Sequence, residues 1–361
     1  MWGSAVARIA AWAGLACALS GCAALPWPSG FERGRAGLRV DERIDLRGVV
    51  HVHTRVSHDS KGDIGEIVDA AHGAGIAFVA FTEHTYHARL RPACGVVENV
   101  ILIPGWEVNS AGASILALGV ERRARLPRDP VKLVAEIHRR GGLALVGHLE
   151  SSELSDPERF AAAAPDGIEI VNLHAVALEV SGRLALGELL LPAPLALRSL
   201  LRTPAANLAR FARLPAARTL VGGVDAHAKF RALGPLGGTL DRYRDLFRLV
   251  TTHVLARTRT AEGVLEALRE GRSYVAFEGV APVSHFGVVR TPGGVAVQAP
   301  EEARLDLVCD GARASSEQAA QAELLAPAGA ERCHVEAWRG DQLWVITSPF
   351  ELGGESQRVL L

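Results

Sequence analysis

The sequence predicts an α/β fold of parallel strands and helices, followed by a smaller antiparallel β unit. Short apolar runs recur between residues 47 and 277, and several are followed by a stretch of helical periodicity. Many of these runs end in His, Asp or Glu, at the carboxyl ends that parallel strands share on one rim. Beyond residue 281 the helical pattern stops, and a hairpin pattern begins around Pro292-Gly293-Gly294.

The composition limits the classes of function. The chain has 361 residues, enough for one large and one small domain, and 48% of them are hydrophobic. Its 39 basic residues nearly balance its 40 acidic residues. Because no basic field attracts a polyanion, we expect a small-molecule substrate and no nucleic-acid partner.

The first 22 residues have the pattern of an export signal. Arg8 precedes an apolar run over 9–19, which is short for a membrane span. The run ends in Leu19-Ser20-Gly21-Cys22, which resembles a bacterial lipobox, so we expect Cys22 to be lipidated. An ordinary signal peptide and an uncleaved anchor are the alternatives. Residues 23–44 then form a tether, and the chain is exported and lipid-anchored in the cell envelope. The absence of an acidic residue at positions 23 and 24 favours the periplasmic face of the outer membrane.

The other cysteines do not predict a thiolate metal site. Cys94, Cys309 and Cys333 form no C-x-x-C pair, which is the spacing typical of such sites. An exported chain can form disulfides, and Cys309 with Cys333 is the expected pair because both lie in the last segment.

Residues 47–84 predict a strand, a helix and a second strand. The first strand carries His51 and His53 on one face, because side chains alternate along a strand. The second strand, over 78–81, leads to Glu83 and His84. Parallel strands joined by a right-handed crossover end at one rim, so we expect these three histidines to converge there.

The helix of this unit has clear start and stop signals. Asp63 is a capping residue, and Gly73 and Gly75 suit the end of the helix. One apolar stripe at helical spacing is formed by Ile64, Ile67, Val68 and Ala71.

The same arrangement recurs further along the chain. Strands are predicted over 100–103, 114–120, 143–146, 168–171, 219–224 and 273–277. Turn residues Pro104 and Gly105 place Glu107 just past the first of them. The candidate ligands that follow these strands are Glu107, His148, His174, Asp225 and His227, with Asn172 as a turn or supporting residue.

Helical patterns separate several of these strands. Asp129 caps a helix that has Pro130 in its first turn and a predicted stripe of Val131, Val134, Ala135 and His138. A Leu/Ala-rich helical region covers 182–214, and another helix spans 260–271.

Imidazole and carboxylate groups at so many strand ends indicate a metal site. Buried ionisable groups are costly unless they are paired or bound to a metal. A single histidine on an apolar strand is more often a core residue. We therefore assign structural positions to His72, His138, His253, His285 and His334, and we keep His87 as a candidate lining residue.

The order of these motifs resembles the PHP (polymerase and histidinol phosphatase) superfamily. The resemblance covers residues 47–277 and rests on His51-Val52-His53, Thr82-Glu83-His84, Gly105-Trp106-Glu107, His148 and Asp225-Ala226-His227. It implies a distorted (βα)7 barrel over 45–280 and two or three divalent metal ions. A small antiparallel, β-sandwich-like domain over 281–361 follows. The stretches over 142–150 and 168–175 are most similar to a lipoprotein-type branch that includes carbaryl-hydrolase-like proteins.

The resemblance also implies a ligand set. Glu83 stands where the family usually has aspartate, and Ser57-His58-Asp59-Ser60 replaces its usual S-D-G, so Asp59 is the preferred ligand and His58 the alternative. The implied metal ligands are His51, His53, Asp59 or His58, His84, Glu107, His148, His174, Asp225 and His227. The implied catalytic residues are His148, His227 and Glu107, with either histidine as proton donor to the leaving group.

This ligand set is suited to Zn, Mn or Fe at a hydrolytic centre. We expect a phosphoesterase in which a hydroxide bridging two or three metal ions attacks phosphorus. Arg55, Lys61 and Lys229 are candidates for phosphate binding or solvated surface charges. One alternative is a hydrolase of a carbamate, amide or carboxyl ester. An alternative of another class is a catalytically silent binding protein of the envelope.

Overall fold

The computed structural model describes residues 39–40, 43–84, 91–110, 113–121, 126–149, 161–176, 201, 203–212, 217–229 and 241–352. The predicted signal region with Cys22, most of the predicted tether, His87 and most of the predicted helical region over 182–214 lie outside these residues. Among the described helices, none is long and apolar enough to cross a membrane.

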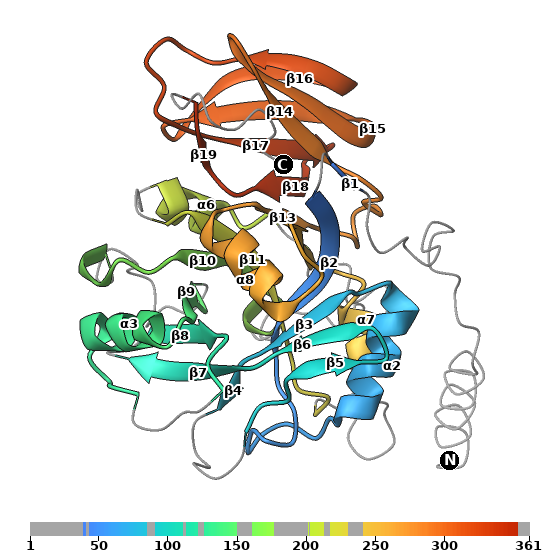
Figure 1. The fold of residues 1–361 in the computed structure, drawn as a ribbon. Coiled ribbons are helices and arrows are strands. Elements are labelled where there is room, and N and C mark those ends of the chain that lie inside the picture. Colours follow the sequence, from blue (N-terminus) through green and yellow to red (C-terminus); the bar gives the residue numbers. More distant parts are fainter. Residues whose placement is uncertain are drawn as a thin grey trace, which may run out of the picture.

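The fold is a mixed α/β structure organised around a large sheet (Figure 1). Strand β2 (Arg43–Val52) lies between β3 (Phe78–Phe81) and β11 (Thr219–Ala226) and is parallel to both. Strand β3 is also parallel to β6 (Val100–Ile103). On the other side, β11 is parallel to β10 (Gly167–Asn172). The parallel strands predicted from the apolar runs therefore lie side by side.

The remaining strands of this part depart from a regular succession of seven βα units. Strand β9 (Leu143–Gly147) is parallel to β10, but β8 (Ala113–Leu118) is antiparallel to both β9 and β7 (Gly105–Ser110). Strand β7 is parallel to β4 (Glu83–His84). Glu107 thus follows the end of β6, as expected, but it lies inside β7 and not in a turn.

One further strand is antiparallel to β2, and its own neighbour reverses direction again. Strand β12 (Thr251–Ala256) runs antiparallel to β2 and to β13 (Ser273–Ala276). No strand was predicted over these residues, whereas His253, which was assigned a structural position, lies within β12 and is buried.

The helices begin and end close to their predicted signals. In α2 (Ile64–Ala74), the Asp63 side chain accepts a hydrogen bond from the Glu66 backbone N–H at 3.0 Å. Gly75 ends this helix with a φ of 67°, a left-handed conformation that favours glycine. The other described helices are α3 (Pro130–Arg139), α6 (Ala205–Ala212), α7 (Tyr243–Leu246) and α8 (Ala261–Arg269).

The predicted apolar stripe of α3 was largely wrong. The buried residues of this helix are Leu133, Val134 and Ile137, whereas Val131, Ala135 and His138 are exposed. The predicted stripe and the buried one both follow helical spacing. The larger side chains of the buried one occupy the core because they bury more apolar surface.

The C-terminal strands gather at one end of the molecule (Figure 1). They are antiparallel: β14 (Gly287–Thr291), β15 (Gly294–Cys309), β16 (Ala312–Leu325), β17 (Arg332–Arg339), β18 (Gln342–Thr347) and β19 (Phe350–Glu351). Strand β18 also pairs with β13, so these strands continue the large sheet. Two short strands, β1 (Arg39–Val40) and β5 (Gly95–Val97), pair with β2 and β6.

The C-terminal strands have their own hydrophobic core. Leu305, Val335 and Trp344 are fully buried in it, and Tyr274 of β13 joins it from the α/β part. Cys309 and Cys333, direct partners on β15 and β17, form a disulfide as predicted.

Candidate metal centre

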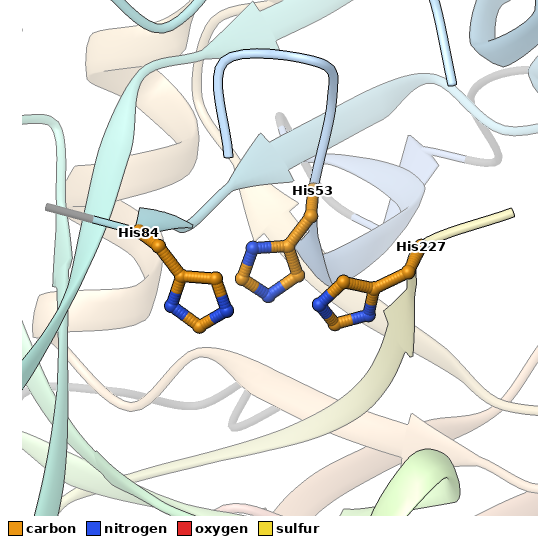
Figure 2. A group of neighbouring side chains, drawn as sticks. All are labelled: His53, His84 and His227. Carbon is orange, nitrogen blue, oxygen red and sulfur yellow. The ribbon is translucent and has the colours of Figure 1, made fainter. Parts of the chain in front are cut away.

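Three histidines from separate segments stack their rings at the carboxyl ends of the central strands (Figure 2). His53 follows β2, His84 ends β4 and His227 follows β11. The ring of His53 lies between the other two, with centroids 4.5 Å from His84 and 4.1 Å from His227. The predicted convergence of the H-x-H and D-A-H motifs is therefore seen.

A second group lies beside these histidines. The His51 Nε2 atom is 3.3 Å from Glu107 Oε2 and 3.5 Å from Asp225 Oδ1. The His148 Nε2 atom is 3.0 Å from Glu107 Oε1 and 3.6 Å from Asp225 Oδ2. Glu107 and Asp225 are buried, so each places its two carboxylate oxygens among several imidazoles.

The loop after His53 brings Asp59 to the same cluster. Its Oδ2 atom is 3.3 Å from His227 Nε2, and its Oδ1 atom is 3.4 Å from His84 Nε2. The His58 side chain is 50% exposed, and its ring centroid lies 5.4 Å from that of His84. Of the two alternatives left open by the sequence, Asp59 is the one whose carboxylate lies against His84 and His227.

His174 lies at the edge of the cluster, in a helical turn over 173–176. Its ring centroid is 5.3 Å from that of His227. Within the described part of the chain, four overlapping groups have donor atoms within 4.8 Å of one another: His53, His84 and His227; His51, His53 and Glu107; His51, His148 and Asp225; and His174, Asp225 and His227.

Three residues of the centre have strained backbone conformations. His51, His148 and Asp225 have φ values of 66°, 56° and 46°, a left-handed region that non-glycine residues rarely adopt. The β2–β3 register shifts between Val50 and Val52, as expected at a β-bulge. Bulges re-aim side chains, and residues held in such conformations cluster at functional sites.

Three histidines form hydrogen bonds through Nδ1 and direct Nε2 toward the cluster. His227 Nδ1 donates to the backbone carbonyl of Asp225 at 3.0 Å, which can only accept. His51 Nδ1 donates to Glu169 Oε1 at 2.6 Å. His53 Nδ1 is 3.2 Å from Ser57 Oγ, whose own hydrogen goes to Glu83 Oε2. Nε2 is thus the atom that each of these rings directs toward the cluster.

The charges at the centre suit a cation. Burial lowers the pKa of His53 to about 3, so this imidazole is neutral at neutral pH. Burial alone would raise the pKa of Glu107 and of Asp225, but nearby histidines, His51 foremost, hold both well below their usual range. A neutral imidazole beside ionised carboxylates is the donor set that divalent metal ions take.

Unpaired buried atoms provide an independent test of this fit. His53 Nε2, Asp225 Oδ1, His227 Nε2 and Asp59 Oδ1 are buried without a hydrogen-bond partner among the described residues. Such atoms are costly to bury unless a ligand satisfies them. All four belong to the predicted ligand set, so the residues present fit a metal centre.

Glu83 has a supporting position and belongs to none of the four groups. It is fully buried, and its carboxylate accepts hydrogen bonds from Thr54 Oγ1 and Ser57 Oγ, both at 2.6 Å. It also accepts from the Thr54 backbone N–H at 3.1 Å. The Glu83 carboxylate therefore holds the loop between His53 and Asp59.

Sequence reasoning missed Glu169, which contacts His51 from inside β10. The available signal was a carboxylate in the otherwise apolar run Ile168-Glu169-Ile170-Val171. Asn172, read as a turn or supporting residue, donates to Glu169 Oε2 at 3.1 Å and accepts from the Ala175 backbone N–H at 2.9 Å.

The three basic candidates near the motifs differ in position. Lys229 Nζ donates to Asp59 Oδ2 at 2.9 Å, at the edge of the cluster. Arg55 is exposed and pairs with Asp63 at 2.8 Å, and Lys61 is exposed. Of these three, only Lys229 forms an ion pair with a residue of the centre within the described part of the chain.

No protein-family model and no curated protein matches this sequence. Among solved structures, the chain is similar to a two-domain protein from Bacteroides vulgatus ATCC 8482 that contains a predicted PHP-like metal-dependent phosphoesterase. The identity is 14%, the TM-score is 0.40, and the alignment covers 87% of this chain and 97% of the other.

Proposed function

We propose that this protein is a metal-dependent hydrolase of the PHP type, with phosphate esters as its favoured substrates. The observation that carries the proposal is the set of four overlapping donor groups that share His51, His53, Asp225 and His227. Shared ligands at this spacing are suited to two or three neighbouring ions. When bound, such ions lower the pKa of water and neutralise phosphoryl oxygens.

The residues around the centre would orient an anionic substrate. Lys229 holds its positive charge beside Asp59, at the partly exposed edge of the cluster, where it can bind a phosphoryl oxygen. His84 and His148 are about one fifth exposed, whereas His51 and His53 are fully buried. The substrate would therefore approach from the side of His84, His148 and Lys229.

Activity measurements on the full-length chain, purified in detergent, test this proposal. We expect cleavage of p-nitrophenyl phosphate or bis-p-nitrophenyl phosphate by the protein loaded with Zn or Mn, and its loss in His53→Ala. Cleavage of a p-nitrophenyl carbamate alone would favour the alternative of a carbamate, amide or ester hydrolase. A metal-loaded protein that cleaves none of the three would favour a silent binding protein.

We also propose that the chain is anchored to the cell envelope through a lipid on Cys22. The support is the sequence Leu19-Ser20-Gly21-Cys22 after an apolar run. Metabolic labelling with an alkyne fatty acid tests it. Label should enter the wild type and be lost in Cys22→Ala, while equal labelling of both would contradict the anchor.

A further inference from the structure

Glu169 is a fully buried carboxylate directly behind the metal centre. It lies in β10, and its Oε1 atom accepts a hydrogen bond from His51 Nδ1 at 2.6 Å. Within the described part of the chain, its only ion-pair partner is His51. A carboxylate without an Arg or Lys partner is expensive to bury, so its hydrogen bonds must be complete.

The second oxygen of Glu169 reaches another residue of the centre. Oε2 accepts from the backbone N–H of His148 at 3.0 Å and from Asn172 Nδ2 at 3.1 Å. His51 and His148 are two of the residues with left-handed backbone conformations, at φ values of 66° and 56°. One carboxylate therefore bonds to both strained positions.

Neighbouring strands leave room for this carboxylate. A Cβ atom on Gly223 of β11 would lie only 1.6 Å from Glu169 Oε1. On the other side, a Cβ atom on Gly147 of β9 would lie 3.3 Å from Oε2. Glycine at position 223 is thus required for Glu169 to reach His51.

We infer that Glu169 is a positioning residue that fixes the tautomer of His51 and the orientation of its Nε2 atom. Because Oε1 only accepts, His51 must carry its hydrogen on Nδ1 and present Nε2 to Glu107 and Asp225. The inference rests on the metal centre of the proposed function, but it does not depend on which substrate is cleaved.

Glutamine cannot replace Glu169 at this position. Oε1 receives one donor and Oε2 receives two, so both atoms must accept. A glutamine amide would place its NH₂ group against either His51 Nδ1–H or the donors from His148 and Asn172. One hydrogen bond in the first orientation, or two in the second, are then replaced by repulsive contacts between donors.

The test compares Glu169→Gln with a matched control, Glu278→Gln. Glu278 is also buried and bonded, to Arg47 at 2.9 Å and to Thr251 at 3.1 Å, but it contacts no residue of the centre among the described residues. We would titrate full-length wild type and both variants with Zn or Mn against a competing chelator. We expect affinity to fall about 10- to 100-fold in Glu169→Gln and to stay unchanged in Glu278→Gln.

A second measurement needs no variant. Long-range ¹H–¹⁵N spectra of the ¹⁵N-histidine-labelled, metal-loaded protein should show His51 with a hydrogen on Nδ1 and none on Nε2. A hydrogen on Nε2, or equal metal affinity in wild type and Glu169→Gln, would overturn the positioning role. A wild-type chain that binds no metal would instead contradict the proposed function, so the two failures are distinguishable.

Discussion

His53 Nε2 and Asp225 Oδ1 lie 3.2 Å apart, both buried, and share no hydrogen bond. Burial keeps His53 neutral, with its pKa at about 3, and its hydrogen is on the Nδ1 side near Ser57. Two acceptors therefore face each other at close range. This arrangement is stable when both atoms bind the same cation.

Asp225→Asn should remove metal from the centre. Asp225 belongs to two of the four donor groups, and an amide is a much poorer ligand than a carboxylate. We expect metal affinity to fall by more than the roughly 10- to 100-fold typical of a supporting residue, measured by chelator competition. Asp306→Asn, a buried change in β15, is the matched control and should keep wild-type affinity.

Metal removal should lower the thermal stability of the chain. An ion that binds only the folded state adds about 2.7 kcal/mol at 100 times its dissociation constant. We expect a chelator to lower the melting temperature and added Zn or Mn to restore it, as measured by differential scanning fluorimetry. A melting temperature that is the same with and without chelator would contradict a structural contribution from the metal.

Replacing Lys229 with alanine should weaken substrate binding more than turnover. If Lys229 binds a phosphoryl oxygen, loss of this charge-assisted hydrogen bond should cost about 1.5–3 kcal/mol, or about tenfold or more in KM for a phosphate ester. Steady-state kinetics with p-nitrophenyl phosphate measures this. Lys132→Ala, an exposed change on α3, is the control. A fall in kcat alone would contradict the binding role.

The buried network around His253 should make stability depend on pH. Burial alone would lower the pKa of His253, but the carboxylates of Asp45 and Glu278 outweigh it and raise this pKa above its usual 6.5. His253 Nδ1 is 2.9 Å from Asp45 Oδ1, and its ring stacks on Tyr274 at 4.5 Å. Arg47 also faces the network, 2.9 Å from Glu278.

The sign of this pH dependence follows from the linkage between protonation of His253 and folding. A raised folded-state pKa contributes stability that is fully present below about pH 6.5 and is lost as pH rises through the folded-state value. The difference in unfolding free energy between wild type and His253→Gln should therefore shrink as pH rises above 6.5. Urea titrations at several pH values measure it, and a difference that grows with pH would contradict the charged state of His253.

Opening the Cys309–Cys333 disulfide should destabilise the C-terminal strands without removing metal. The bridge spans a sequence separation of 24, for which the chain-entropy estimate is about 3.5 kcal/mol. We expect Cys309→Ser/Cys333→Ser to unfold at lower urea, and the metal content to stay at the wild-type level. Loss of metal in this variant would show that the centre depends on the C-terminal strands.

The sequence was most informative where ligands are close together along the chain. His51 with His53 and Asp225 with His227 are separated by two positions at strand ends, so periodicity alone indicates that they share a site. Asp63 and Gly75 likewise marked the ends of α2, because capping is a local property.

The features that the sequence did not predict depend on contacts between distant segments. Glu169 bonds to His51 across 118 positions, and its local signal, a carboxylate in an apolar run, does not say which residue it contacts. His253 was assigned a structural position, but its pairing with Asp45 arises only because β12 runs antiparallel to β2. The direction of β8 also depends on tertiary pairing, which no local pattern specifies.

The metal content of the purified full-length chain tests the central claim most directly. We expect two or more equivalents of Zn, Mn or Fe per chain by inductively coupled plasma mass spectrometry, and the loss of at least one equivalent in His53→Ala. A folded wild-type chain that contains no metal, and binds none when Zn, Mn and Fe are supplied, would contradict it.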